Sequence, residues 1–181
     1  MGGDSATAVR EGRREREKQL LKAVLGERLN SDPKGLKIEI AAGGKPFVNG
    51  CKFSISHSGA WLIVAVSDRE IGVDIETRKA LKDPMALATR FFSPADADYL
   101  KSAREDLREK FFLRQWVAKE AALKCAGTGI SEHLHRAECG YEQSAITTVG
   151  CAADRFAIHE FMLPDETPGA VAWHDDGTLV G

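Results

Sequence analysis

Residues 71–76 constrain the fold of this chain more than any other segment. They place two carboxylates, Asp74 and Glu76, two positions apart in a β-favouring apolar run. Side chains alternate between the faces of a strand, so both acids point one way while Val73 and Ile75 point the other. Two like charges on one face of a half-buried strand are unfavourable unless a cation lies between them. The sequence therefore predicts a metal ion or a basic partner at this strand.

Composition excludes several other classes of protein. The chain has 181 residues, 43% hydrophobic and 29% charged, which is typical of one soluble domain or two small packed halves. A formal net charge of -2 argues against general nucleic-acid binding. No apolar run approaches the roughly 18 residues of a membrane helix, and the N-terminus lacks a signal-peptide core. The cysteines are scattered without a CxxC pair, so we expect reduced thiols in a cytoplasmic protein.

Two further runs predict strands close to residues 71–76. Residues 53–56 alternate between apolar residues and serine and lead into His57. Residues 61–66 are uniformly apolar, which predicts a strand buried on both faces. Because only a short polar turn separates residues 61–66 from 71–76, we expect these two runs to form an antiparallel hairpin. The pair Ser56 and His57 could present hydrogen-bond donors to a ligand, and a capped turn is the alternative.

Helices are predicted over residues 10–29 and 110–125. The first begins with mixed charges and continues as an apolar stripe. The second contains no glycine or proline and is followed by Gly127, which is typical of a helix C-terminus. Glu120 and Lys124 are four residues apart in this helix and therefore share one face. An ordinary surface ion pair between them is the alternative to a functional role.

Five motifs follow one another along the chain in an informative order. They are GKP at 44–46, FSISHSG at 53–59, IGVDIE at 71–76, RFFSP at 90–94 and WVAKEAALK at 116–124. In this order and spacing they resemble the 4'-phosphopantetheinyl transferase superfamily, in particular its larger, monomeric type. The resemblance covers about residues 45–130, close to half of the chain, and IGVDIE and WVAKEAALK are its most specific parts.

The resemblance implies a transferase and the residues of its active site. Such an enzyme moves 4'-phosphopantetheine from coenzyme A to a serine of an acyl or peptidyl carrier protein and releases 3',5'-ADP. It implies Mg²⁺, with Mn²⁺ as an alternative, held by Asp74, Glu76 and Glu120. Lys124 corresponds to the family's diphosphate lysine, so Glu120, Lys124 and Asp74 are the expected catalytic residues. Glu120 or a metal-bound water would take the serine proton, and we favour Glu120.

Coenzyme A itself would be bound by basic and polar side chains from several motifs. By the same resemblance these are Lys45, Ser56, His57 and Lys124, with Arg13, Arg14 and Lys22 expected at the 3'-phosphate. The last three are expected because family members of this type carry a longer basic N-terminal portion, whereas here residues 10–29 precede the first strand. Two further departures are Ala121, where a serine is common, and Asp96, where a glutamate is common.

The fold implied by the resemblance is α+β with two similar halves. Each half would be a small antiparallel sheet packed with a long helix, the two related by a pseudo-twofold axis. The first half would span residues 1–100 and the second 101–181, with the active site in the cleft between them. We expect a monomer without nucleic-acid or membrane partners.

Two other functions stay open at this point. One is a catalytically impaired homologue that binds coenzyme A or a carrier protein without transferring anything. The other is a metal-dependent pyrophosphate hydrolase that uses the same acids. The hydrolase would form product from coenzyme A with no carrier protein present.

Overall fold

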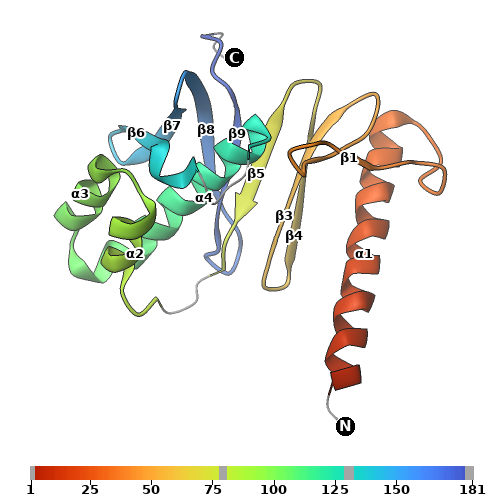
Figure 1. Ribbon diagram of the computed structural model, residues 1–181, viewed down its shortest axis with the longest axis horizontal. Coiled ribbons are helices and arrows are strands. Elements are labelled where there is room, and N and C mark those ends of the chain that lie inside the picture. The colour runs from red at the N-terminus through yellow and green to blue at the C-terminus, as the bar shows by residue number, and fades with distance from the viewer. Residues whose placement is uncertain (1–2, 78–80, 129–132, 178–181) are drawn as a thin grey trace.

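The computed structural model describes residues 3–77, 81–128 and 133–177 and has the predicted α+β class of fold (Figure 1). Its helices are α1 (Gly3–Leu29), α2 (Pro84–Phe91), α3 (Pro94–Ser102), η1 (Glu105–Leu107), α4 (Arg108–Ala126) and η2 (Leu134–Arg136). Its strands are β1 (Glu39–Ile40), β2 (Pro46–Phe47), β3 (Lys52–Ser58), β4 (Trp61–Ser67), β5 (Ile71–Ile75), β6 (Ala137–Glu142), β7 (Ala145–Cys151), β8 (Asp154–Met162) and β9 (Pro168–His174).

An antiparallel five-stranded sheet, in the order β5-β9-β8-β7-β6, packs against α4. Strands β3 and β4 form a separate antiparallel pair, and β1 and β2 form a short one. The predicted pairing of residues 61–66 with residues 71–76 is therefore wrong, because β4 pairs with β3 and β5 pairs with β9. The tight turn after Ser58, where Gly59 has φ +60, pairs β4 with the strand directly before it in the register Ser58↔Trp61, while β5 packs beside β3 and takes β9 as its ladder partner.

Strand β4 is less buried than its sequence predicts. Every residue of the strand is half-buried instead of being covered on both faces. Helix α1 packs beside β4, while the strand's outer edge has no paired strand in the part of the chain that the structure describes. An apolar run at an unpaired edge keeps part of its surface exposed to solvent.

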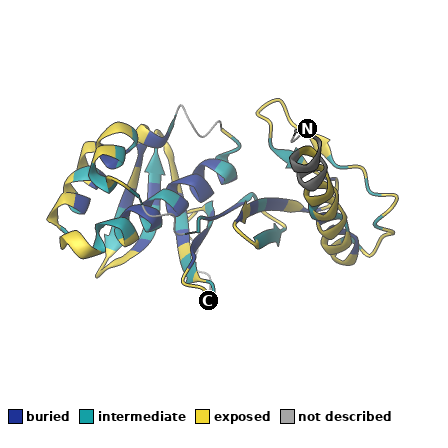
Figure 2. Cartoon of the chain, turned by 90° about the horizontal axis from the view of Figure 1, so that it is seen from below, coloured by how far each residue is buried: buried dark blue, intermediate teal, exposed yellow. Residues whose placement is uncertain are grey.

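The largest apolar core lies between α4 and the five-stranded sheet. Val117 and Ala121 of α4 are fully buried there against Val149 and Phe156 of the sheet. Figure 2 shows the contrast between α4, which is mostly buried, and α1, which is mostly exposed. Two smaller cores lie under α1 and among α2, α3 and α4, and the second contains Phe92 and Leu100.

The division at residue 100 and the pseudo-twofold axis stay predictions. The structure adds that β5, which belongs to residues 1–100, pairs with β9 of the later half. The two halves are therefore interlocked through the segment that carries Asp74. Among the described residues, no helix combines the length and apolar character needed to cross a bilayer.

Gly72 sets how closely β5 approaches α4. A Cβ atom at this position would lie 1.9 Å from the Ala121 carbonyl oxygen and 2.5 Å from the Cys125 amide nitrogen. Both atoms belong to the α4 backbone and cannot move aside as a flexible side chain could. The glycine in IGVDIE is therefore required for the strand and the helix to touch directly.

Gly72→Ala should destabilise the protein by about 3 kcal/mol or more, because overpacking against a helix backbone forces α4 away from β5. The free energy of unfolding from urea titration measures this loss. Gly150→Ala on β7 is the matched control, since no atom lies within 4 Å of the added Cβ. A loss at Gly72 no greater than at Gly150 would contradict the proposed close contact.

Candidate active site

Asp74 and Lys124 form the centre of the candidate site. The Asp74 carboxylate is buried, and its Oδ1 accepts hydrogen bonds from Lys124 Nζ at 2.6 Å and from Ser56 Oγ at 2.7 Å. Lys124 Nζ also donates to the carbonyl oxygens of Val73 at 3.2 Å and Ile55 at 3.5 Å. One ammonium group therefore joins α4, β5 and β3. Burial raises the pKa of Asp74, and the charge and hydrogen bond of Lys124 together with the Ser56 hydroxyl oppose that rise.

Serine hydroxyls connect β3 to β5 where no backbone ladder does. The two strands lie side by side, but their backbones are not paired in a sheet. Each buried serine of β3 instead accepts a hydrogen bond from a β5-side amide: Val73 N to Ser54 Oγ at 3.0 Å, Ile75 N to Ser56 Oγ at 3.3 Å and Thr77 N to Ser58 Oγ at 2.9 Å. The alternation in FSISHS thus points three hydroxyls at the neighbouring strand.

Glu76 lies on the same side of its strand segment as Asp74, as predicted. Its Oε1 accepts a hydrogen bond from Ser58 Oγ at 3.1 Å, just as Asp74 accepts one from Ser56. Both carboxylates are therefore turned toward β3. The two like charges therefore lie on one side of the β5 segment, and Lys124 forms an ion pair with Asp74.

Glu120 is the third carboxylate of the site and comes from α4. It is 8% exposed, and burial together with the charge of Asp74 raises its pKa to about 7, although Lys124 opposes this. Within the described residues its carboxylate has no hydrogen bond or ion pair. The alternative of a surface pair between Glu120 and Lys124 does not hold, because Glu120 is buried and Lys124 bonds to Asp74.

The donor set fits a hard divalent cation in its chemistry. Three carboxylates, from Asp74, Glu76 and Glu120, lie close enough for the charges of Asp74 and Glu76 to raise the pKa of Glu120 in addition to burial, while Lys124 lowers it. Oxygen ligands of this kind suit Mg²⁺ or Mn²⁺ better than softer metals. Among the described residues, however, no three His, Cys, Asp or Glu side chains are close enough to form a complete metal site. The three acids are near one another, but their oxygens are not arranged as the ligands of one metal ion.

Lys45 lies at the C-terminus of α4. Its Nζ donates to Glu70 Oε2 at 2.8 Å, to the Cys125 carbonyl at 3.2 Å and to the Ile71 carbonyl at 3.3 Å. A positive charge at a helix C-terminus is favourable because the last carbonyl groups lack partners within the helix. The GKP loop is thereby attached to the helix that carries Lys124.

A cavity of about 240 Å³ connects these two lysines. Lys45 and Lys124 both line it, together with Phe53, Ile55 and Gly127. Phe53 and Ile55 of β3 give the cavity an apolar wall, and Lys45 and Lys124 give it positive charge. These features suit a flat heterocycle joined to phosphates.

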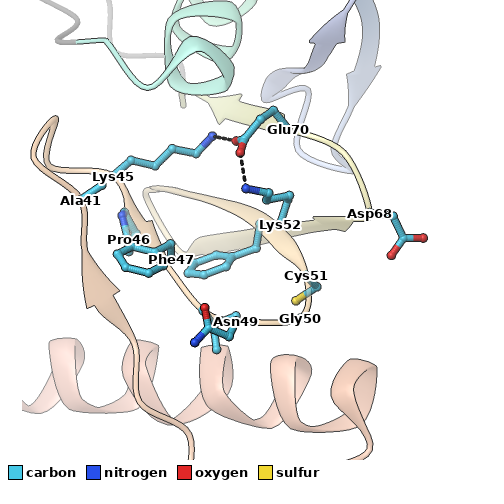
Figure 3. Close-up of a pocket in the computed structure, with 12 residues that line it drawn as sticks. Ala41, Lys45, Pro46, Phe47, Asn49, Gly50, Cys51, Lys52, Asp68 and Glu70 are labelled. Atoms are coloured by element: carbon cyan, nitrogen blue, oxygen red, sulfur yellow. Dashed lines mark hydrogen bonds and ion pairs between the residues drawn. The ribbon is translucent and has the colours of Figure 1, made fainter.

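A larger cavity lies elsewhere, between residues 46–53 and the turn before β5. It has a volume of about 410 Å³, and Lys45 and Lys52 reach Glu70 across it at 2.8 Å and 2.6 Å (Figure 3). Burial opposes the charge on Glu70, but the hydrogen bonds and charges of the two lysines outweigh it and hold the pKa below its usual value. Lys124, which bonds to Asp74, does not line this cavity but does line the smaller one. The smaller cavity is therefore the better candidate.

Several expected coenzyme A residues are not brought to this centre. His57 is exposed, and strand alternation turns it away from the face that carries Ser56. Arg13, Arg14 and Lys22 belong to α1, which stands across the β3–β4 pair from α4 (Figure 1). Ser56 itself is at the centre, but its hydroxyl is engaged with Asp74 and the β5 backbone.

A buried ion pair on the other side of α4 was missed by the sequence reasoning. Lys119 Nζ lies 2.6 Å from Asp96 Oδ2, and both side chains are almost completely buried. Lys119 also donates to the Ala137 carbonyl at 2.6 Å, and Tyr141 donates its hydroxyl to Asp96 at 3.2 Å. A signal existed in the sequence, because the apolar stripe of α4 runs through position 119, where a charge requires a partner. The pair fixes α4 against α3 and β6.

Comparison with known proteins gives a consistent family. The model of the 4'-phosphopantetheinyl transferase superfamily matches residues 70–172. The chain is 32% identical over 162 residues to the 4'-phosphopantetheinyl transferase HetI of Nostoc sp. (strain PCC 7120 / SAG 25.82 / UTEX 2576), covering 84% of this chain and 67% of that protein. It is 34% identical over 115 residues to a 4'-phosphopantetheinyl transferase of Bacillus subtilis, covering 62% of this chain and 50% of that protein.

A third relative is the 4'-phosphopantetheinyl transferase psf-1 of Bacillus pumilus. It is 39% identical over 99 residues, covering 53% of this chain and 42% of that protein. The chain thus spans about half to two thirds of the length of two of these relatives and less than half of the third. The matched family region contains β5, Glu76 directly after it, and α4, and therefore all three carboxylates and Lys124. On the sequence match and this arrangement, the chain belongs to the 4'-phosphopantetheinyl transferase superfamily.

Proposed function

We propose that this protein transfers 4'-phosphopantetheine from coenzyme A to a serine hydroxyl of an acyl or peptidyl carrier protein, leaving 3',5'-ADP. One observation carries the proposal. Asp74 and Glu76 of the β5 segment and Glu120 of α4 come together around Lys124, which lines a cavity together with Lys45. Acids for a divalent cation and lysines for phosphates are the two groups that this reaction needs.

Asp74, Glu76 and Glu120 would hold Mg²⁺, with Mn²⁺ as the alternative. When bound, the cation neutralises charge on the diphosphate and stabilises the leaving phosphate group. Glu120 supports this assignment because its buried carboxylate has no cationic partner of its own among the described residues. Burial is the main cause of the raised pKa of Glu120, and a divalent ion would offset both this cost and the repulsion from Asp74 and Glu76.

Lys124 and Lys45 would position the nucleotide. Lys124 already lies beside Asp74 at 2.6 Å, so a diphosphate next to the acids would meet its ammonium group. Lys45 also lines the 240 Å³ cavity and contacts the last turn of α4 through the Cys125 carbonyl. Charge complementarity and fixed placement are the main sources of catalysis in phosphoryl transfer.

Glu120 would accept the proton of the attacking serine. The serine oxygen forms a bond to phosphorus, the bond from phosphorus to 3',5'-ADP breaks, and the serine proton passes to a Glu120 oxygen. Glu120 is suited to this role because it is carried by a well-packed helix and, unlike Asp74, has no hydrogen bond to give up.

Mass spectrometry of apo-carrier proteins incubated with the enzyme, coenzyme A and Mg²⁺ tests the transfer. The expected result is a phosphopantetheine adduct on the carrier serine, abolished by a chelator and reduced at least 100-fold by Asp74→Asn or Lys124→Met. His135→Asn in the 3-10 helix η2 is a control that should keep full activity. The absence of adduct with every one of several carriers would refute the proposal.

The same assay without a carrier separates transfer from hydrolysis. A transferase should leave coenzyme A intact when no acceptor hydroxyl is present. Steady release of 3',5'-ADP from coenzyme A alone, followed by chromatography, would instead identify a pyrophosphate hydrolase.

The metal-free protein should lose stability as pH rises, because of Glu120. Its pKa of about 7 in the folded state lies above the reference value of 4.5, so its contribution is fully present below pH 4.5 and is lost as pH rises through 7. In the presence of a chelator, the free energy of unfolding should fall by up to about 3 kcal/mol between pH 5 and pH 8. Mg²⁺ should restore more stability at pH 8 than at pH 6.

Two variants check the origin of this pH dependence. Glu120→Gln should flatten the curve, since the group that loses its proton is gone. Glu70→Gln should leave the slope between pH 5 and 8 unchanged, because the lowered pKa of Glu70 places its effect at more acidic pH. Identical slopes for the wild type and Glu120→Gln would disprove the assignment.

A further inference from the structure

The serine row of β3 repeats one arrangement at a fixed offset from β5. Ser56 Oγ accepts from Ile75 N at 3.3 Å and donates to the preceding residue's carboxylate, Asp74 Oδ1, at 2.7 Å. Two positions on, Ser58 Oγ accepts from Thr77 N at 2.9 Å and donates to Glu76 Oε1 at 3.1 Å. Each serine hydroxyl thus accepts a hydrogen bond from the amide of one residue and donates one to the carboxylate of the residue before it.

The first serine of the row makes only half of this arrangement. Ser54 Oγ accepts from Val73 N at 3.0 Å, and the residue before Val73 is Gly72, which has no side chain to receive a bond. All three serines are about equally buried, at 5%, 5% and 6% exposure. Backbone attachment of β3 to β5 is therefore common to the whole row, whereas the carboxylate bond occurs only opposite the two acids.

The hydrogen-bonding capacity of Ser58 is fully used. A hydroxyl has one proton to donate and two lone pairs to accept with. At Ser58 the proton goes to Glu76, while the Thr77 amide and the Thr77 hydroxyl, at 3.0 Å, can occupy the acceptor sites. At Ser56 the proton goes to Asp74 and the Ile75 amide takes an acceptor site. Neither hydroxyl can rotate to another partner without breaking a bond to β5.

We infer that Ser56 and Ser58 are positioning residues that orient Asp74 and Glu76 toward the divalent cation. This inference rests on the proposed function, which makes the two acids metal ligands. A carboxylate that is hydrogen-bonded from one side presents a fixed oxygen to the metal, and loss of such a partner typically weakens metal binding by about 10–100-fold. The role of Ser56 in binding the nucleotide stays a prediction, and the structure adds its bond to Asp74.

Binding of Mn²⁺ to the full chain without coenzyme A tests the inference. Free Mn²⁺ is measured by electron paramagnetic resonance while the wild type and the single variants Ser54→Ala, Ser56→Ala and Ser58→Ala are titrated. Ser56→Ala and Ser58→Ala should each weaken Mn²⁺ binding by about tenfold, and Ser54→Ala should leave it unchanged within twofold. Ser54→Ala is the matched control, since it loses a backbone bond at the same depth.

Thermal unfolding of the same proteins separates orientation from general stability. All three variants should lower Tm by at least about 2–4 °C, because each loses a bond to an amide of the β5 segment, and Ser56→Ala and Ser58→Ala should lower it further because each also loses a carboxylate bond. Each variant should stay folded at the temperature of the Mn²⁺ titration, so that a change in Mn²⁺ affinity reports on the carboxylates and not on unfolded protein. If Ser56→Ala does not fold, Ser58→Ala makes the same comparison with Ser54→Ala.

The outcomes distinguish this inference from the proposed function. Equal weakening of Mn²⁺ binding by all three variants, or none by Ser56→Ala and Ser58→Ala, would overturn the positioning role. Asp74→Asn should abolish Mn²⁺ binding, and this tests the metal site itself. If the wild type binds no Mn²⁺ at all, both the metal site and the positioning role are refuted.

Discussion

Strands β3 and β5 lie side by side without backbone pairing. The rest of the site depends on the side-chain hydrogen bonds across this seam between the two strands. Buried amide and carbonyl groups need partners, because an unpaired one costs as much as a lost hydrogen bond. Three serine hydroxyls accept hydrogen bonds from two amides of β5 and from the Thr77 amide just after it, and Lys124 donates to a carbonyl of each strand. Side chains therefore do at this seam what backbone pairing does elsewhere in the sheets. Asp74 lies in the middle of it and completes the bonding of both Lys124 and Ser56.

Helix α4 is held against this seam from two directions. On the β5 side, Gly72 lets the strand touch the helix backbone at Ala121. On the opposite side, the buried pair of Lys119 and Asp96 ties the helix to α3 and β6. A buried ion pair is a costly anchor, but it can specify one orientation where apolar packing alone would tolerate several. The adjacent residue Glu120 is thereby turned toward the acids of β5.

The sequence was most informative where chemistry is encoded locally. Alternation placed Asp74 and Glu76 on one face, and Gly127 does end α4 with a left-handed φ of 72. The order and spacing of the motifs predicted the family correctly and assigned Glu120 and Lys124 to one site without any knowledge of strand pairing. In each case, neighbouring residues or fixed spacings were sufficient.

Pairings between distant segments could not be read in the same way. The residues of β4 (Trp61–Ser67) do not specify which strand they pair with. The next strand in sequence, β5, pairs instead with β9, which lies far along the chain. The ion pair between Lys119 and Asp96 could not be predicted either, because it depends on how α3 packs against α4. The serine row was visible as a repeat in FSISHS, but its offset from β5 is a property of the folded seam.

The unpaired edge of β4 has a consequence for association. In the described part of the chain β4 is paired on one side only, and residues 61–66 contain neither a charge nor a proline that would discourage a further strand. A strand added there would extend the hairpin outward, in the direction opposite to the serine row. The carboxylates and Lys124 lie beyond β3 from that edge. Self-association through β4 would therefore change the size of the particle in solution without covering the acids.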